Sequence, residues 1–306
     1  KEAHDRAARG DGPTLVVADV VRLWAHSSSD NAALYRSQEE IDNLDKRDPI
    51  TLEEAHLVEH GYATRKELDA IKAEIKSKID KAGDWVEEQP FAQDALTHVF
   101  YEGEHAVTSP GPEPKTDGEP EVMIDLINRA MHEEMERNEK IVVFGQDVAK
   151  GKGGVFTATK GLTDAFGIER CFNSPLAEAT IAGVAGGLAH GGDWKPLVEI
   201  QFGDYIFPAI EQIFNEIATC RYRSNNNWAN PMVIRVPVGG YIQGAMYHSQ
   251  SIDSMFAHRP GLRVAIPSRA DDAKGLLKAA LRGEDPVVFM EPKFLYRQSR
   301  AKAPDP

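Results

Sequence analysis

The chain has 306 residues, of which 42% are hydrophobic and 27% charged, a composition typical of a globular protein with one large domain or two ordinary ones. The formal net charge of −13 argues against a nucleic-acid partner, because phosphates require a basic surface. No apolar run is long enough to span a membrane, and the first residues lack the apolar core of a signal peptide. Cys171 and Cys220 show no metal-ligand spacing and no disulfide framework, so we expect structural thiols in a reducing compartment.

Residues 1–100 predict one strand followed by helices. The apolar run at 14–23 is typical of a buried strand. Three Ser/Thr-x-x-Glu spacings match the capping box at a helix start, at Ser37, Thr51 and Thr64. Behind the last of them, apolar residues recur at helical spacing and predict one buried stripe: Leu68, Ile71, Ile75, Ile79 and Val86.

Two segments are expected as linkers. Residues 101–121 contain four prolines and almost no apolar side chains, so they cannot bury enough surface to order themselves. The end of the chain, 299–306, has a similar composition. We expect a domain between them, at 122–298, and a boundary at the end of the chain.

Between the linkers, short apolar strands alternate with helices. Helices are expected at 124–135, 177–190, 206–222, 251–258 and, behind a cap at Ser268, 270–283. Strands are expected at 141–145, 197–202, 231–238, 263–267 and 286–292. This order predicts an α/β fold in which helices cover both faces of a mostly parallel sheet.

Three clusters in this region carry candidate site residues. Glu178 begins an apolar, glycine-containing helix, where a carboxylate is paired, caps the helix or is functional. Gln201 and Tyr205 follow a strand, and the carboxyl ends of parallel strands are where ligands bind. His248 follows a glycine-rich loop and titrates near neutrality, although a structural role for such a histidine stays open.

These clusters together resemble a known enzyme family. The strings NSPLAEATIAG, EIQFGDYIFPA, RYRS, YHSQS, FAHRPGLRV, AKGLL and EPK resemble the beta subunit of the decarboxylating component of 2-oxo acid dehydrogenases, nearest the branched-chain members. The strings GPTLVVADVVRLWAHSSSDNAALYRS and KRDPI resemble the C-terminal end of the alpha subunit. An alpha-like segment before a beta-like one resembles a single-polypeptide version of the enzyme.

The resemblance implies a thiamine diphosphate-dependent oxidoreductase, with roles for the beta-like residues. Glu178 would share a proton with the aminopyrimidine ring of the cofactor. Leu176, Gln201 and Tyr205 would line the pyrimidine pocket. His248 would handle a proton when the acyl group passes to lipoyl-lysine.

On the alpha-like side, the resemblance places His26 at a catalytic loop histidine. Arg22 would lie with it near the diphosphate and supply local positive charge. Asp30, Tyr35 and Arg36 would contact the substrate or order the loop. Ser27 aligns with a serine that is phosphorylated in mitochondrial relatives, which predicts a charge switch there only weakly, because a serine tract is usually a plain polar loop.

A glycine–aspartate–glycine run at 10–12, with Asn43 downstream, imitates the family's magnesium–diphosphate motif. The residues that follow it match a later alpha strand, so we interpret the run as a decoy and expect no metal ligand in this chain. The Mg²⁺ ligands would come from a segment that the chain does not contain.

The expected function is oxidative decarboxylation of a 2-oxo acid with acyl transfer to a lipoyl domain. Expected partners are the alpha-like portion of the same or another protomer, in a dimer or pseudo-tetramer, and a lipoyl-bearing acyltransferase in a multienzyme complex. A pyruvate or acetoin dehydrogenase and a non-catalytic assembly fragment stay open as alternatives. A bacterial cytoplasm is favoured over the mitochondrial matrix as the compartment.

Overall fold

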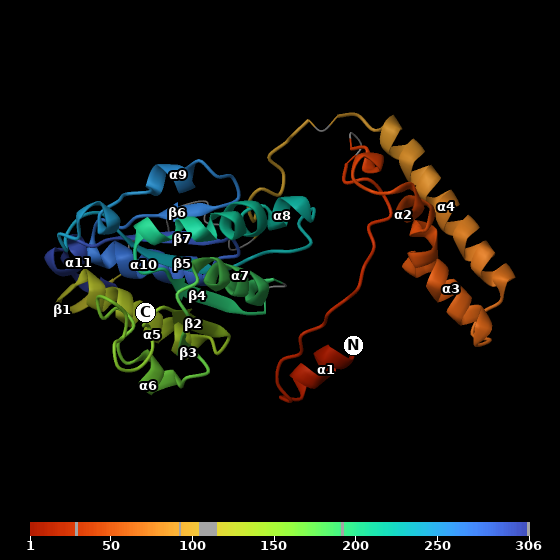
Figure 1. Cartoon of the computed structure of the whole chain (residues 1–306). Coiled ribbons are helices and arrows are strands. Elements are labelled where there is room, and N and C mark those ends of the chain that lie inside the picture. The colour runs from red at the N-terminus through yellow and green to blue at the C-terminus, as the bar shows by residue number, and fades with distance from the viewer. Residues whose placement is uncertain (28–29, 92, 104–114, 191–192, 305–306) are drawn as a thin grey trace. The chain divides into compact units, whose positions relative to one another are not determined.

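The computed structural model describes residues 1–27, 30–91, 93–103, 115–190 and 193–304 (Figure 1). The chain divides into two compact units, Lys1–Ala92 and Gln93–Pro306. Most of the expected linker at 101–121 lies outside the described residues. None of the helices in the described parts combines the length and apolar character needed to cross a bilayer.

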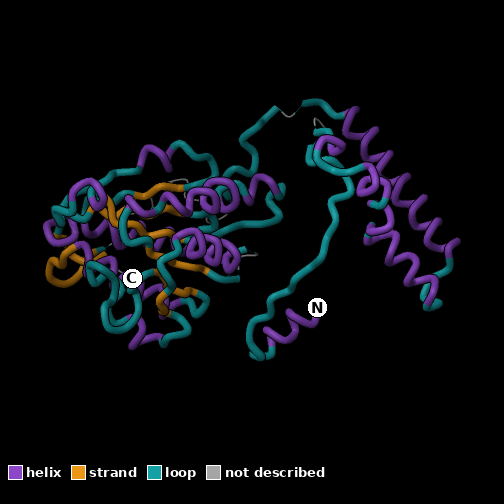
Figure 2. The backbone as a smooth tube through the Cα atoms, in the orientation of Figure 1, coloured by secondary structure: helices purple, strands orange, loops and turns teal. Residues whose placement is uncertain are grey.

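The first unit is helical (Figure 2). Its helices are α1 (Glu2–Ala8), η1 (Ala32–Leu34), α2 (Gln38–Asp42), η2 (Leu44–Arg47), α3 (Pro49–Glu59) and α4 (Arg65–Glu88). The strand predicted at 14–23 is wrong, because this segment forms neither helix nor strand, and Leu15 and Val17 are 90% and 85% exposed. A strand needs a neighbour for its backbone groups, and the described residues of this unit supply none.

Two of the three predicted capping boxes are confirmed. The side chains of Ser37 and Thr64 accept from the third helical N–H, and the glutamate at that position bonds back. The box at Thr51 is wrong, because α3 begins earlier, with Asp48 as its cap and a proline at its first position.

The predicted apolar stripe lies on one helix, α4, but only part of it is covered. Leu68 is buried, whereas Ile71, Ile79 and Val86 are more than half exposed and Ile75 nearly so. The helical spacing therefore identifies the apolar face correctly, while the described residues of this unit leave most of that face open.

The second unit is built on a six-stranded sheet with strand order β3-β2-β4-β5-β7-β6, and every pair in it is parallel. The strands are β2 (Ile141–Gly145), β3 (Cys171–Asn173), β4 (Lys195–Glu199), β5 (Val233–Val238), β6 (Arg263–Ala265) and β7 (Val287–Pro292). The helices include α5 (Met123–Arg137), α6 (Leu162–Phe166), α7 (Glu178–Ala189), α9 (Asp253–Ala257), α10 (Ala270–Arg282) and α11 (Leu295–Gln298). The predicted α/β fold with a mostly parallel sheet is confirmed.

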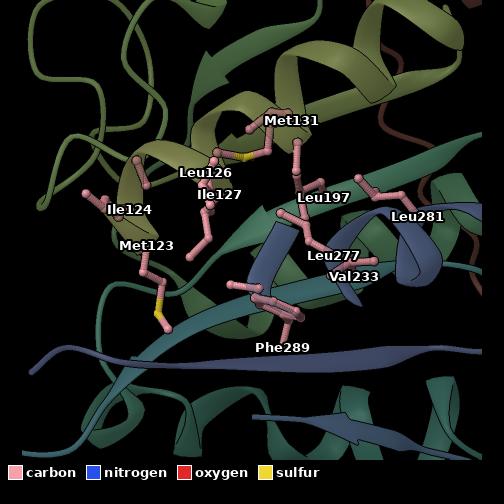
Figure 3. Close-up of a cluster of buried hydrophobic side chains, with 14 of the residues drawn as sticks. Met123, Ile124, Leu126, Ile127, Met131, Leu197, Val233, Leu277, Leu281 and Phe289 are labelled. Carbon is pink, nitrogen blue, oxygen red and sulfur yellow. The ribbon is translucent and has the colours of Figure 1, made fainter. Parts of the chain in front are cut away.

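Successive strand residues face opposite sides of the sheet, and each side has its own core. On β7, Val287 and Phe289 join a cluster with α5 and α10, whereas Val288 and Met290 join one with α7. Figure 3 shows the first cluster, where Leu277 of α10 lies near Phe289 and Met131 of α5 lies next to Leu126. The cysteines, Cys171 and Cys220, are buried and free, as expected.

Three local expectations differ from the structure. The helix expected at 206–222 is broken into η4 (Phe207–Ala209), a π-helical turn η5 (Gln212–Ile217) and α8 (Cys220–Arg223). The cap of α10 is Arg269, which makes no side-chain cap bond, so Ser268 is not the cap.

The third difference lies in the segments expected as linkers. β1 (Thr116–Val122) and β8 (Arg300–Pro304) pair as an antiparallel two-stranded sheet. Strand pairing satisfies their backbone groups without requiring apolar side chains, which is why their composition did not reveal it.

Candidate active site

Polar residues of the second unit, among them the predicted Glu178 and Gln201, gather where parallel strands end. Gln146 directly follows β2, Gln201 lies two residues beyond β4, and Lys293 directly follows β7. Glu178 opens α7, which follows β3. The carboxyl edge of a parallel sheet is the usual place for a ligand, and this edge concentrates the candidate side chains.

Glu178 is the first residue of α7 and is half-buried. Its Oε1 accepts a hydrogen bond of 2.9 Å from Nε2 of Gln146, whose side chain is only 5% exposed. The Gln146 amide donor fixes the orientation of the carboxylate. One carboxylate oxygen is thus held in place, in a position from which the group can share a proton with a ligand.

Gln201 connects to the same group of residues. Its Nε2 donates to the backbone oxygen of Gln146 at 3.2 Å and to Oδ2 of Asp147 at 3.4 Å. A hydrogen bond from Lys152 holds the pKa of Asp147 below its usual range. Glu178 and Gln201 are therefore linked through Gln146.

Tyr205 and His248 form a second group. The Tyr205 hydroxyl lies 3.5 Å from Nε2 of His248, and Nδ1 of His248 lies 3.4 Å from the carbonyl oxygen of Gly244. Phe202 packs edge to face against the imidazole, with ring centroids 4.7 Å apart. An imidazole beside a phenol hydroxyl is suited to proton transfer.

Leu176 does not join either group. It lies two residues before Glu178 in the loop that follows β3, and its side chain is 81% exposed. Its expected place in a pyrimidine pocket stays a prediction, and the exposed apolar side chain leaves it available for contact with a ligand or a partner.

The five candidate residues of the first unit are brought together. Arg22 donates to the Tyr35 hydroxyl at 2.7 Å, and that hydroxyl donates to Asp30 at 2.5 Å. The backbone N–H of His26 donates to the same Asp30 oxygen at 2.8 Å. Arg36 donates to the backbone oxygen of Arg22 at 2.9 Å. Asp30 thus holds both His26 and Tyr35 in place, and two guanidinium groups lie beside them.

These hydrogen bonds determine the protonation states of Asp30 and Tyr35. The hydrogen bond from Tyr35, followed by that from the His26 backbone, lowers the pKa of Asp30. The same bond to Asp30 raises the pKa of Tyr35. Asp30 is therefore a carboxylate and Tyr35 a phenol at neutral pH.

The residues of the glycine–aspartate–glycine run are engaged elsewhere. Asp11 pairs with Arg9 at 3.1 Å. The Asn43 side chain donates to the Glu39 carbonyl at 2.7 Å and accepts from Lys46 at 2.6 Å. Within the described residues, no group of three or more His, Cys, Asp or Glu side chains is arranged to hold a metal ion.

Gln146 is the site residue that sequence reasoning missed. Its position directly after a strand with five buried residues was a usable signal, because the chain turns toward the ligand edge there. Its contact with Glu178, 32 residues downstream, depends on β2 and β3 being neighbours, which spacing alone does not reveal.

Comparison with known proteins defines the class of this domain. Residues 122–299 match the family described as "Transketolase, pyrimidine binding domain", and the chain belongs to that family. Residues 1–94 match a second family, described as "Dehydrogenase E1 component". The resemblance to the decarboxylating component of 2-oxo acid dehydrogenases is thereby confirmed.

Curated relatives narrow the class further. The chain is 54% identical to the 2-oxoisovalerate dehydrogenase subunit beta of Bacillus subtilis, over 59% of this chain and 55% of that protein. It is 50% identical to the mitochondrial 2-oxoisovalerate dehydrogenase subunit beta of Dictyostelium discoideum, over 60% and 49%. It is 45% identical to the pyruvate dehydrogenase E1 component subunit beta of Mycoplasma genitalium, over 59% and 55%. The chain spans about half the length of these relatives.

The site residues fit an aminopyrimidine ring at the carboxyl edge of the sheet. Such a ring offers a nitrogen acceptor and an amino donor, and the edge supplies a held carboxylate at Glu178 and an amide at Gln201.

Proposed function

We propose that this chain carries the pyrimidine-binding half of a thiamine diphosphate-dependent oxidoreductase that decarboxylates a 2-oxo acid. The observation that carries the proposal is Glu178, held by buried Gln146 at the ligand edge of a domain of the pyrimidine-binding family. A branched-chain 2-oxo acid is the favoured substrate, because two of the three relatives above are named for 2-oxoisovalerate.

When bound, the cofactor would accept the electron pair released by decarboxylation. Glu178 would share a proton with the pyrimidine nitrogen, and Gln146 would keep its carboxylate oriented. Leu176, Gln201 and Tyr205 would hold the ring in place. His248 would pass a proton when the acyl group is transferred to a lipoyl domain, with Tyr205 positioning its imidazole.

In the first unit, Arg22 and His26 would stabilise negative charge on the diphosphate and at the reacting centre. Asp30 supports this role, because its carboxylate accepts from the His26 backbone and from the Tyr35 hydroxyl, which in turn accepts from Arg22. Arg36 would reinforce the loop through the Arg22 backbone. No magnesium ligand is proposed from this chain.

Two other assignments have support. The 45% identity to a pyruvate dehydrogenase beta subunit supports a pyruvate-type substrate. The half-length match to the relatives supports a half-site that is inactive by itself.

For partners, we propose a dimer or pseudo-tetramer in which an alpha-like portion completes the site, and a lipoyl-bearing acyltransferase. The support is exposed apolar surface that a partner could cover, such as Val17, Trp24 and Ile79. A bacterial cytoplasm remains the favoured compartment, beside the mitochondrial matrix suggested by the Dictyostelium relative.

Calorimetric titration of thiamine diphosphate with Mg²⁺ tests the proposal. It should be made on this chain and on the enzyme at its full natural length, with Glu178→Gln and, as a matched control, Glu136→Gln on the exposed face of α5. We expect binding and 2-oxo acid turnover in the full-length enzyme, and a turnover loss of about 10²–10⁴-fold in Glu178→Gln only.

The outcome on this chain separates a diphosphate site within this chain from a half-site. Binding by this chain would mean that it holds a diphosphate site, and our decoy interpretation of residues 10–12 would be wrong. Absence of binding, with binding by the full-length enzyme, would identify a half-site. Full turnover in Glu178→Gln would contradict the proposed role of this carboxylate.

A further inference from the structure

Lys293 is a buried cation that the site described so far does not use. It directly follows β7, is 0% exposed, and its backbone N–H donates to the Val238 carbonyl at 3.1 Å. In the described part of the chain, its Nζ has no hydrogen-bond partner. Burial of an unpartnered ammonium is costly, so a structural role alone accounts for it poorly.

A buried carboxylate lies close to it. Both carboxylate oxygens of Asp204, in η3 (Gly203–Tyr205), are buried and lack hydrogen-bond partners among the described residues. Burial lowers the pKa of Lys293 to about 8, and the charge of Asp204 opposes that shift. The two groups interact electrostatically but are not among the salt bridges of the described residues. Neither group therefore occupies the hydrogen-bonding positions of the other.

Phe202 connects this pair to the candidate site. Nζ of Lys293 lies 5.4 Å from the Phe202 ring centroid, and the same ring packs at 4.7 Å against the imidazole of His248. Because both distances share the Phe202 ring, the ammonium lies within about 10 Å of the imidazole, a range over which partly buried charges still interact. Tyr205, whose ring contacts His248 and lies 6.1 Å from the Phe202 ring between centroids, is the residue after Asp204.

We propose that Lys293, beside the Phe202 ring, and Asp204, next to Tyr205 in the chain, are positioning residues that set how readily the His248 imidazole takes up a proton. The inference rests on the proposed role of His248. The positive charge of Lys293 disfavours the imidazolium form, and the negative charge of Asp204 favours it. Among titratable groups, Tyr205 contacts His248 directly and Lys293 contacts the Phe202 ring, while Asp204 precedes Tyr205 on η3 and Tyr247 precedes His248 on its own helix, η6 (Ala245–His248).

The test is an NMR titration of the His248 imidazole in the full chain, with the resonance assigned by its loss in His248→Gln. We expect Lys293→Met to raise the titration midpoint by about 0.3–1 pH unit, and Asp204→Asn to lower it by a similar amount. The double variant should return close to the wild-type midpoint, and Lys293→Arg should keep it, because the charge is retained.

A general change in packing would not shift the His248 midpoint in opposite directions in the two single variants and leave it unchanged in the double variant. Unchanged midpoints in both single variants, or shifts of the same sign, would overturn the inference. Lys293→Met leaves Asp204 buried without a counter-charge, so it should be less stable than the wild type, although we expect it to fold. If it does not fold, the two single variants Asp204→Asn and Lys293→Arg still decide. Asp204→Asn must lower the His248 midpoint, and Lys293→Arg must leave it unchanged.

Turnover of the full-length enzyme separates this inference from the proposed function. If the midpoints do not respond while His248→Gln abolishes acyl transfer, only the inference is lost. If they respond as expected while His248→Gln keeps full transfer, the proposed role of His248 is lost instead.

Discussion

Arg235 is the most completely buried guanidinium in the second unit, and it lies at the centre of the sheet. Its side chain donates twice to Glu291 of β7 and once to Glu199 of β4, each at 2.7 Å. The Tyr296 hydroxyl donates to Glu291 as well. Burial by itself would lower the pKa of Arg235, but the two carboxylates outweigh it and raise the pKa. One cation thus compensates two acids that water cannot reach.

Replacing Arg235 by methionine should therefore destabilise the fold strongly. Glu199 and Glu291 would be left buried without a counter-charge, at a cost of about 3–5 kcal/mol in the free energy of unfolding. Urea unfolding measures it. Arg223→Met is the matched control, because Arg223 pairs with Glu216 at the surface, where such pairs contribute less than about 1 kcal/mol. A similar small loss in both variants would contradict the argument.

The acidic groups between α5 and α10 give the interface of these two helices a pH dependence. Burial would raise the pKa of Glu133, but hydrogen bonds from Lys274 and Lys278 outweigh it and the pKa is lowered. Burial likewise acts on Glu134, and Arg282 outweighs it, so that this pKa is lowered too. Both carboxylates are therefore more acidic in the folded chain than in the unfolded one.

A folded-state pKa below the unfolded value of 4.5 contributes stability that is fully present above that pH and is lost as the pH falls through the folded pKa. We expect the urea midpoint of the second unit to be steady near neutrality and to drop below about pH 4.5. Glu134→Gln should be less stable near neutrality and show a shallower drop. A drop of equal size in the variant would exclude Glu134 as a source.

The glycines of α7 differ in what surrounds them. A Cβ at Gly187 would meet nothing within 4 Å, whereas one at Gly186 would come within 3.2 Å of Ile217. Both residues are helical, and glycine in a helix interior costs about 1 kcal/mol against alanine. Gly187→Ala should therefore raise the free energy of unfolding by about 0.5–1 kcal/mol, and Gly186→Ala should raise it less or lower it. Thermal unfolding of the pair measures this, and an equal gain in both variants would contradict the argument.

The sequence predicted elements best where a repeating apolar pattern determines the structure. The strands and helices of the sheet domain, including α5 (Met123–Arg137), follow from alternation and helical spacing. Breaks such as η4 and η5 do not, because they depend on how local backbone bonds rearrange inside an apolar run. At the site, Glu178 could be predicted from its unusual place in an apolar helix. Gln146 and the Lys293–Asp204 pair could not, since they depend on contacts between distant strands.

At the scale of the whole molecule, the apolar pattern identifies which face of a helix or strand is suited to burial, but not which other part of a protein covers that face. The segment 14–23 and the stripe of α4 both have the pattern of buried elements, yet most of their side chains are exposed within their own unit. The second unit, by contrast, closes a core on each face of its sheet. The two halves of the chain therefore differ in how far their own residues complete a core.

The start of the second unit is attached to its sheet by two aromatic residues. The Phe100 ring lies 4.8 Å from the Arg263 guanidinium carbon, and the Tyr101 ring lies 5.1 Å from that of Arg221. The backbone N–H of Tyr101 donates to Asp285 at 2.9 Å, and both arginines pair with the same carboxylate. This arrangement fixes Phe100 and Tyr101 beside the edge strand β6.

Removing both rings should loosen this edge without unfolding the sheet. Each cation–π contact contributes about 0.5–2 kcal/mol, so Phe100→Ala with Tyr101→Ala should speed amide exchange in β6 by roughly ten- to a hundredfold while β4 and β5 stay protected. Leu96→Ala is the matched control, because Leu96 lies in the same segment with its side chain 72% exposed. Equally fast exchange in the control, or unchanged exchange in the double variant, would show that these rings do not anchor the segment. The Arg221–Asp285–Arg263 cluster would then hold the edge by its ion pairs alone.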